Sequence, residues 1–261
     1  MNSTKKTARI AGLLYLLMGV TSTLSLNIPS AFIIRGDAAA TADKIASSQL
    51  FYRLCIVSDL AAQVLFVFLV LVLYQLLKEV DKRLATLMVA LVLVQVPMGF
   101  ANMLVGMAPL VLLNGATFWS VFDKQQLDAL AMGSLTLRGY GINAIIALWG
   151  LWLLPFGLLV FRSGFIPRIL GVFLMIACFA DLTISVTSLL FPAYEPMVHK
   201  LIILGVGELL IILWLLIKGA RAQPLDDAVS ARRVVRLQTS AAAEGAHHKK
   251  PTQHSAPEDG A

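Results

Sequence analysis

The stretch RGYGINAIIALWGLWLLPFGLLVFRSGFIPRILG, from Arg138 to Gly171, decides the fold. About twenty apolar residues lie between Arg138 and Arg162, which is the length that a helix needs to cross a hydrocarbon core about 30 Å thick. In the turn that follows, Gly164 is free to adopt a positive φ and Pro167 suits a first helical turn. Another apolar run begins immediately afterwards, so the stretch predicts a helical hairpin that crosses a membrane twice.

The composition is that of an integral membrane protein. Hydrophobic residues make up 58% of the 261 residues and charged residues only 14%, whereas roughly a quarter of the residues in a soluble domain are charged. The net charge of +6 does not indicate binding to nucleic acid, because the basic residues divide by side of the membrane and do not cluster on one face. Cys55 and Cys178 lie in apolar runs without a CxxC motif, so they indicate no redox role.

The apolar runs predict an all-α fold, a six-helix membrane domain over residues 1–218. The expected spans are about 10–28, 54–77, 84–107, 140–161, 168–191 and 201–217. The first run is longer than the 7 to 15 residues of a signal-peptide core, so we expect a retained helix. Asp123 is expected to cap a separate short interfacial helix before the fourth span. Residues 219–261 have no periodic apolar face and predict a disordered basic tail.

The basic residues predict the orientation of these helices. With the amino terminus inside, 15 of the 21 Lys and Arg residues lie on the cytoplasmic side, as the positive-inside rule requires. The six on the other side are Arg35, Lys44, Arg53, Lys124, Arg138 and Lys200. Both termini are therefore expected in the cytoplasm.

Three acids lie inside the predicted spans, where an ionisable side chain costs on the order of 3 kcal/mol and normally has a partner. From a rise of about 1.5 Å per residue, Asp59, Asp181 and Glu208 all fall in the outer half of the membrane or near its midplane. Polar residues on the same and neighbouring helices are expected at that depth, which predicts one outward-facing polar pocket. The candidate ligand- or ion-binding residues are Asp59, Gln63, Arg138, Tyr140, Asn143, Asp181 and Glu208.

Three functional hypotheses remain open. In the first, the polar residues only fix helix register in a structural or regulatory protein, whose basic tail recruits partners. In the second, the surplus carboxylates bind or transport a small solute, a cation or a proton. The third is a metal-dependent enzyme that uses Asp59, Asp181, Glu208 and His199, whose spacing matches no tight metal motif.

These hypotheses limit the expected partners and chemistry. No phosphate loop, GxSxG elbow or Cys/His nucleophile pattern is present. We therefore assign no catalytic residue, metal or cofactor, and an enzyme is the least favoured class. The expected partners are the lipid bilayer and a small solute or ion, without nucleic acid, and the sequence predicts no oligomeric state.

Three segments resemble one protein family. They are KKTARIAGLLYLLMGV (Lys5–Val20), RLCIVSDLAAQVLFVFLVLVLYQLLK (Arg53–Lys78) and WGLWLLPFGLLVFRSGFIPRILGV (Trp149–Val172). Together they are similar to the bacterial multi-pass membrane family known as domain of unknown function 4386, and the turn SGFIPRILG (Ser163–Gly171) is the most specific match. The resemblance covers nearly all of Lys5–Lys218. It implies an uncharacterised bacterial inner-membrane protein and brings no reaction, ligand or catalytic residue with it.

Overall fold

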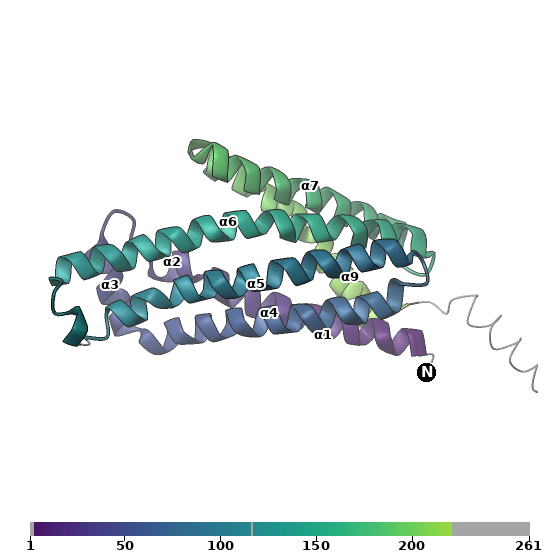
Figure 1. The fold of residues 1–261 in the computed structure, drawn as a ribbon. Helices are drawn as coiled ribbons and strands as arrows, with labels where there is room; N and C mark the ends of the chain where they lie inside the picture. Colours follow the sequence, from purple (N-terminus) through teal and green to yellow (C-terminus); the bar gives the residue numbers. More distant parts are fainter. Residues whose placement is uncertain (1–2, 116, 221–261) are drawn as a thin grey trace, which may run out of the picture. The chain divides into compact units, whose positions relative to one another are not determined.

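The computed structural model describes residues 3–115 and 117–220, and every regular element in this part of the chain is helical. Six segments are long and apolar enough to cross a membrane. They are α1 (Ser3–Leu26), α4 (Gln49–Leu77), α5 (Lys82–Leu112), α6 (Lys124–Ser163), α7 (Arg168–Leu190) and the run that ends with α9 (Val206–Ile217). Figure 1 shows α4, α5 and α6 side by side, with α7 inclined to them. The expected six-helix, all-α membrane fold is confirmed.

Short helical elements make up the connections. They are α2 (Ile28–Phe32), α3 (Ala38–Ser47), η1 (Thr117–Trp119), η2 (Pro192–Tyr194), α8 (Glu195–Val198) and η3 (His199–Gly205). Of the expected tail, Gly219 and Ala220 are buried against the bundle, and residues 221–261 lie outside the described residues. Whether residue 218 is the domain boundary stays a prediction.

Local signals explain where the long helices begin and end. Asp81 and Asp123 accept hydrogen bonds from the first backbone N–H groups of α5 and α6, and Gln126 completes a capping box at Asp123. Gly164 ends α6 with a φ of +71°, a conformation that glycine adopts without steric cost. The turn between α6 and α7 therefore forms at Gly164, as the sequence predicts.

Helix α6 differs from expectation at its start. Asp123 does not cap a separate interfacial helix but begins α6 itself, which runs for 40 residues without a break. At about 1.5 Å per residue this helix is about 60 Å long, twice the thickness of a hydrocarbon core. The helix continues because the capping box starts it at Asp123 and no proline interrupts it before Pro155.

Helices α4, α5 and α6 therefore extend past the hydrocarbon at one end of the bundle, which we call the distal end. A small separate core fills it, with Ile28, Phe32, Ile45 and Tyr52 fully or almost fully buried. Helix α3 packs there against α6, and Lys124 of α6 forms an ion pair with Asp43 of α3 at 3.2 Å. The distal end is thus a folded cap above the membrane-spanning part.

The last membrane crossing is built from two kinds of helix. The span expected at 201–217 consists of the end of the 3-10 segment η3 followed by α9, which has only 12 residues. Because a 3-10 helix rises about 2.0 Å per residue, η3 and α9 together extend about 32 Å. The 3-10 segment and the short α-helix together are therefore long enough to cross the hydrocarbon core.

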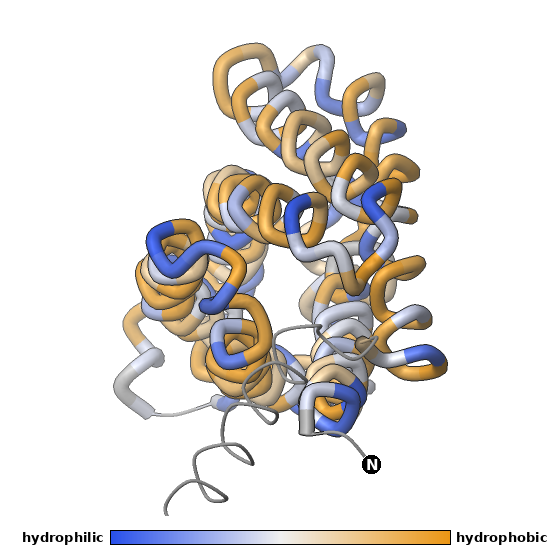
Figure 2. Tube along the Cα trace, turned by 90° about the vertical axis from the view of Figure 1, so that its right-hand side faces the viewer, coloured by the Kyte–Doolittle hydropathy of each residue, from blue (hydrophilic) through white to orange (hydrophobic). Residues whose placement is uncertain are grey.

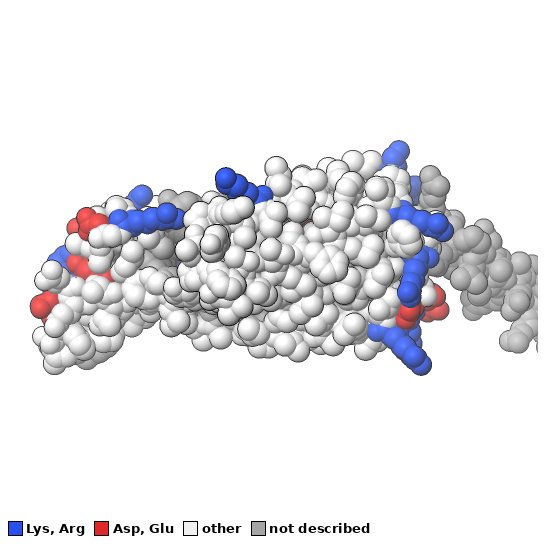
Figure 3. All heavy atoms as spheres, turned by 90° about the horizontal axis from the view of Figure 1, so that it is seen from above, with Lys and Arg blue, Asp and Glu red and all other residues white. Residues whose placement is uncertain are grey.

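The opposite end of the bundle carries most of the described Lys and Arg residues (Figure 3), and we call it the basic end. Its Lys and Arg residues are Lys5, Lys6, Arg9, Lys78, Lys82, Arg83, Arg162, Arg168 and Lys218. Two contacts tie its turns together: Arg162 pairs with Asp81 at 3.2 Å, and Arg9 donates to the backbone oxygen of Ile217 at 3.4 Å. Hydrophobic residues predominate along the helices (Figure 2), and many large hydrophobic side chains are exposed on the outside of the bundle, as in helices surrounded by lipid.

Candidate functional site

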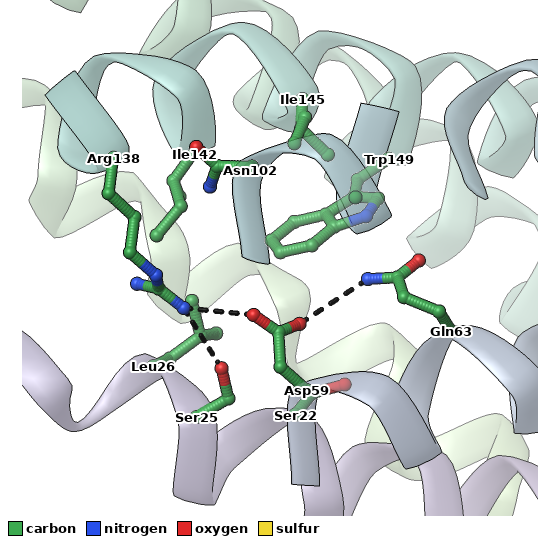
Figure 4. Close-up of a pocket in the computed structure, with 11 residues that line it drawn as sticks. Ser22, Ser25, Leu26, Asp59, Gln63, Asn102, Arg138, Ile142, Ile145 and Trp149 are labelled. Atoms are coloured by element: carbon green, nitrogen blue, oxygen red, sulfur yellow. Dashed lines mark hydrogen bonds and ion pairs between the residues drawn. The ribbon is translucent and has the colours of Figure 1, made fainter. Parts of the chain in front are cut away.

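A buried ion pair joins three helices near the distal side of the membrane. Arg138 of α6 donates to Asp59 of α4 at 2.9 Å and to the Ser25 hydroxyl of α1 at 3.1 Å (Figure 4). The Arg138 side chain is 3% exposed and that of Asp59 is 14% exposed. Breaking a buried pair by removing one partner typically costs 3 to 5 kcal/mol, so this contact holds α1, α4 and α6 in register.

Two glutamines continue the polar contacts from Asp59 toward the middle of the bundle. Gln63 donates to Asp59 at 3.5 Å, and Gln95 of α5 donates to Gln63 at 3.2 Å. Both glutamines are buried. We call the group Ser25, Asp59, Gln63, Gln95, Asn102 and Arg138 the polar seam.

Glycines make room for the polar seam. Gln95, Gly99, Asn102 and Gly106 lie on one face of α5, spaced by four, three and four residues. A Cβ added to Gly99 would lie 2.5 Å from the Gln63 side chain, and one added to Gly106 would lie 2.7 Å from Nε of Arg138. The two glycines therefore let α5 approach α4 and α6 closely enough for polar side chains to meet inside the bundle.

A small cavity lies beside the ion pair (Figure 4). Its volume is about 20 Å³, which exceeds the roughly 10 to 15 Å³ that a water molecule requires. The polar residues that line it are Ser22, Ser25, Asp59, Gln63, Asn102 and Arg138. In this conformation the cavity holds about one water molecule and no larger solute.

A second polar group lies deeper in the membrane. Tyr15 of α1 donates a hydrogen bond to the carboxylate of Glu208 on α9. Asp181 of α7 is within electrostatic range of both side chains, and we call Asp181 and Glu208 the acid pair. Asp181 lies where α7 packs closely against α6. A Cβ added to Gly150 of α6 would lie 2.8 Å from the Cβ atom of Asp181.

The two groups lie at different depths when residues are counted from the basic end. At about 1.5 Å per residue, Asp59 is about 28 Å above Lys78, at the outer boundary of a 30 Å core. By the same count, Glu208 is about 15 Å above Lys218 and Asp181 about 20 Å above Arg168. The acid pair is therefore near the middle of the membrane, and the ion pair is close to its surface.

The structure does not bring all seven candidate residues into one pocket. Asp59, Gln63 and Arg138 meet in the polar seam, whereas Asp181 and Glu208 form the separate acid pair. The expected single pocket is wrong because α4 crosses nearly the whole core between Lys78 and Asp59, which places Asp59 near the outer boundary and well above Asp181 and Glu208.

The other two candidates lie elsewhere. Asn143 donates to Glu195 of α8 at 3.3 Å, and its backbone oxygen accepts from Ser185 at 2.6 Å. Tyr140 is 49% exposed on the outside of α6. Asn143 thus joins α6 to the connection after α7, and Tyr140 contributes to neither polar group.

The metal hypothesis lacks a grouped set of ligands. Within residues 3–115 and 117–220, no three His, Cys, Asp or Glu side chains gather as metal ligands would. Of the four donors considered, Asp59 pairs with Arg138, and His199 contacts the backbone oxygen of Glu195 at 3.3 Å. These positions do not support a metal-dependent reaction at the four residues.

Sequence reasoning did not identify Tyr15, Ser22 and Ser25 as members of a site. They lie on one face of α1 at spacings of seven and three residues, which is the signal that could have found them. Ser and Tyr are common in membrane helices, so this spacing alone is weak evidence for a functional site. Their role emerges only from their partners Glu208 and Arg138.

The six apolar crossings and the polar contacts between them define a multi-pass α-helical membrane protein. Residues 10–219 match the family described as Domain of unknown function (DUF4386), and the chain belongs to this family. The resemblance noted in the sequence is thereby confirmed. No curated protein and no solved structure matched the chain.

Proposed function

We propose that the protein transfers protons across a bacterial inner membrane, with the acid pair as its proton-binding site. The observation that carries this proposal is the position of Asp181 and Glu208 near mid-bilayer, within electrostatic range of each other. In the part of the chain that the structure describes, neither carboxyl group has a Lys, Arg or His partner at ion-pair distance. Arg138, which the sequence offered as their counter-charge, is neutralised by Asp59.

Charge explains why such a pair takes up a proton. Each ionised carboxylate near the centre of a membrane costs on the order of 3 kcal/mol, and two of them in range of each other add repulsion. Uptake of one proton by one of the two carboxyl groups removes most of this cost. Tyr15 stabilises the state with one negative charge by donating to Glu208.

The size and donor set of the two sites favour a proton over the other ligands that the sequence left open. A cavity of about 20 Å³ leaves no room for a polar solute. Hard metal cations take about six or more oxygen ligands, whereas the described side chains at the acid pair offer the oxygens of Asp181, Glu208 and Tyr15 beside the thiol of Cys178. A proton needs only the carboxyl groups themselves.

The proposed orientation places the basic end in the cytoplasm and the distal end on the outer side. The positive-inside rule supports it, because nine described Lys and Arg residues gather at the basic end. The amino terminus and Lys218 then both lie on the cytoplasmic side. The distal cap formed by α3 and the long ends of α4, α5 and α6 projects outward.

The test measures proton flux into liposomes that contain the purified full-length chain and a pH-sensitive dye. A potassium diffusion potential drives the flux, and empty liposomes give the background. We expect flux above background for the wild-type protein and at least a tenfold lower rate for Glu208→Gln and for Asp181→Asn. Asp43→Asn is the matched control, because this exposed carboxylate of the distal end lies far from the acid pair along the chain.

A chemical probe provides a second readout that does not need transport. Dicyclohexylcarbodiimide reacts with protonated carboxyl groups in apolar surroundings, so we expect it to label Glu208 or Asp181 and not Asp43. Wild-type flux equal to that of empty liposomes would refute the proposal, whether or not the probe labels the acid pair. Flux that survives in both carboxyl variants would refute it as well.

A structural function is the second candidate, and the polar seam favours it. The ion pair of Arg138 with Asp59 is closed and also binds Ser25, so it connects three helices. These residues fix helix register, as the first hypothesis from the sequence holds. If the acid pair does not transfer protons, the remaining function is the structural one, in which the polar seam fixes the register of the helices.

A further inference from the structure

We propose that the cavity beside Arg138 is a water site from which protons coming from the distal side reach the acid pair. This inference rests on the proposed function and names the route to its site. Two independent features carry it: a cavity large enough for a water molecule, and a buried polar atom without a partner on Arg138, one of the residues that line it. The route is built from residues of α1 and α6.

The residues that line the cavity include the polar groups that a buried water molecule needs as hydrogen-bond partners. Arg138 is 2% exposed, and its Nε is buried without a hydrogen-bond partner. A second buried atom without a partner is Oε1 of Gln95. Gln95 does not line the cavity itself but donates a hydrogen bond to Gln63, which does. Buried waters typically make about three hydrogen bonds, and Arg138, Asn102 and Ser22 supply a donor, an amide and a hydroxyl at the cavity wall.

The charges at the cavity allow a proton to enter. Arg138 alone would repel a protonated water, but the carboxylate of Asp59 at 2.9 Å neutralises it. The pair lies about 28 Å from the basic end by the count along α4, at the outer boundary of the hydrocarbon core. The cavity is therefore the point of the buried network that lies nearest to the distal solution.

One face of α1 leads from the cavity to the acid pair. Ser22 lines the cavity, and Tyr15 lies two turns away on the same face, a distance of about 10 Å along the helix. Met18 lies between them. On α6, Trp149 lines the cavity, and Trp152 contacts the ring of Tyr15 with centroids 5.9 Å apart.

Met18 and Trp149 thus separate the cavity from Tyr15. A methionine side chain is unbranched and flexible, so it can move aside more readily than a branched residue. About three water molecules in single file, spaced by about 2.8 Å, would then bridge the gap of about 10 Å. We call Met18 and Trp149 the barrier.

The proton step balances without any other reactant. A protonated water in the cavity passes one proton along the transient water file to the Tyr15 hydroxyl. At the same time Tyr15 gives its own proton to the Glu208 carboxylate through the hydrogen bond that it already donates. The cavity water returns to neutral, Tyr15 is restored, and Glu208 becomes a neutral carboxylic acid.

Hydroxyl-radical footprinting of the full-length protein in lipid nanodiscs tests the water site. Radicals formed from a bound water oxidise the nearest reactive side chains, and the two tryptophans compared are the partly buried Trp149 and the buried Trp152. Trp149 lines the cavity, whereas Trp152 is 2% exposed and packs between Tyr15, Phe66 and Phe156. We expect Trp149 to be oxidised at least five times faster than Trp152.

A substitution that fills the cavity provides the control. Ser22→Leu places an apolar side chain at the cavity wall, so it should lower the oxidation of Trp149 to the rate of Trp152. Equal rates for the two tryptophans in the wild-type protein would overturn the water site. Oxidation of Trp149 that persists unchanged in Ser22→Leu would also overturn it, because the water would then lie elsewhere.

Flux measurements with the same variant separate the route from the proposed function. If the route is correct, Ser22→Leu and Tyr15→Phe lower proton flux at least fivefold while carbodiimide still labels Glu208. Unchanged flux in Ser22→Leu, combined with the loss of flux in Glu208→Gln, would overturn the route and leave the proposed function intact. Absence of flux in the wild-type protein would end the proposed function, and footprinting would still decide whether the cavity holds water.

Discussion

Replacement of Arg138 by methionine is the sharpest test of how the bundle is held together. The substitution keeps an unbranched, though shorter, side chain and leaves the Asp59 carboxylate without its cation. Removal of one partner from a buried pair costs about 3 to 5 kcal/mol. Because Asp59 retains 14% exposure and lies at the membrane surface, we expect the lower limit, a loss of about 3 kcal/mol in the free energy of unfolding.

The same reasoning predicts rescue by a second substitution. With Arg138→Met in place, Asp59→Leu removes the unpaired charge, and apolar side chains replace the ion pair. Such replacements are often neutral or stabilising. The double variant should therefore regain most of the lost stability, with a coupling energy of at least about 2 kcal/mol between the two positions.

Reversible unfolding in mixed micelles, followed by circular dichroism or tryptophan fluorescence, measures both effects. A loss of about 3 kcal/mol changes the unfolding constant by a factor of about 150, since each 1.4 kcal/mol is a factor of ten. Arg53→Met serves as the control, because Arg53 is exposed on α4 and should change stability by less than about 0.5 kcal/mol. A coupling energy below about 0.5 kcal/mol would mean that the ion pair does not hold the three helices.

Three further predictions concern packing and helix capping. Gly99→Ala should destabilise the bundle by about 1 to 3 kcal/mol in the same unfolding assay, because its Cβ would lie 2.5 Å from the side chain of Gln63. Gly133→Ala, where nothing lies within 4 Å of the added Cβ, should instead be neutral or stabilising by up to about 1 kcal/mol. Equal effects of Gly99→Ala and Gly133→Ala on stability would contradict the packing described for the polar seam. Asp123→Ala should cost about 0.5 to 2 kcal/mol and speed amide exchange in the first turns of α6 without affecting α7; uniform exchange changes would contradict its role as a local cap.

The glycine and ion-pair predictions also separate two roles for polar residues in one bundle. The polar seam is a connected network in which Arg138, Asp59 and the two glutamines bind one another. The acid pair is an open group, with two carboxyl groups and a single phenol. Stability should therefore depend mainly on the polar seam and proton flux mainly on the acid pair, so the two sets of variants should have different phenotypes.

Several details of the helices lay beyond the sequence because hydropathy does not report where a helix begins. The length of α6 depends on the capping box at Asp123, which lies well before the apolar run. The last crossing depends on a 3-10 segment that hydropathy does not distinguish from an α-helix. Arg138 and Glu208 were expected at one level, but Arg138 pairs with Asp59 about 28 Å above the basic end, whereas Glu208 lies about 15 Å above that end.

The sequence by itself determined that the described chain is a bundle of six membrane-crossing helices. Backbone polar groups in lipid must be satisfied within each segment, so the length and hydropathy of the apolar runs are sufficient for that conclusion. Only the tertiary structure decided which polar side chains meet. Their partners depend on the rotation and tilt of each helix, and these are set by close contacts such as Gly99 against Gln63 and Gly150 against Asp181.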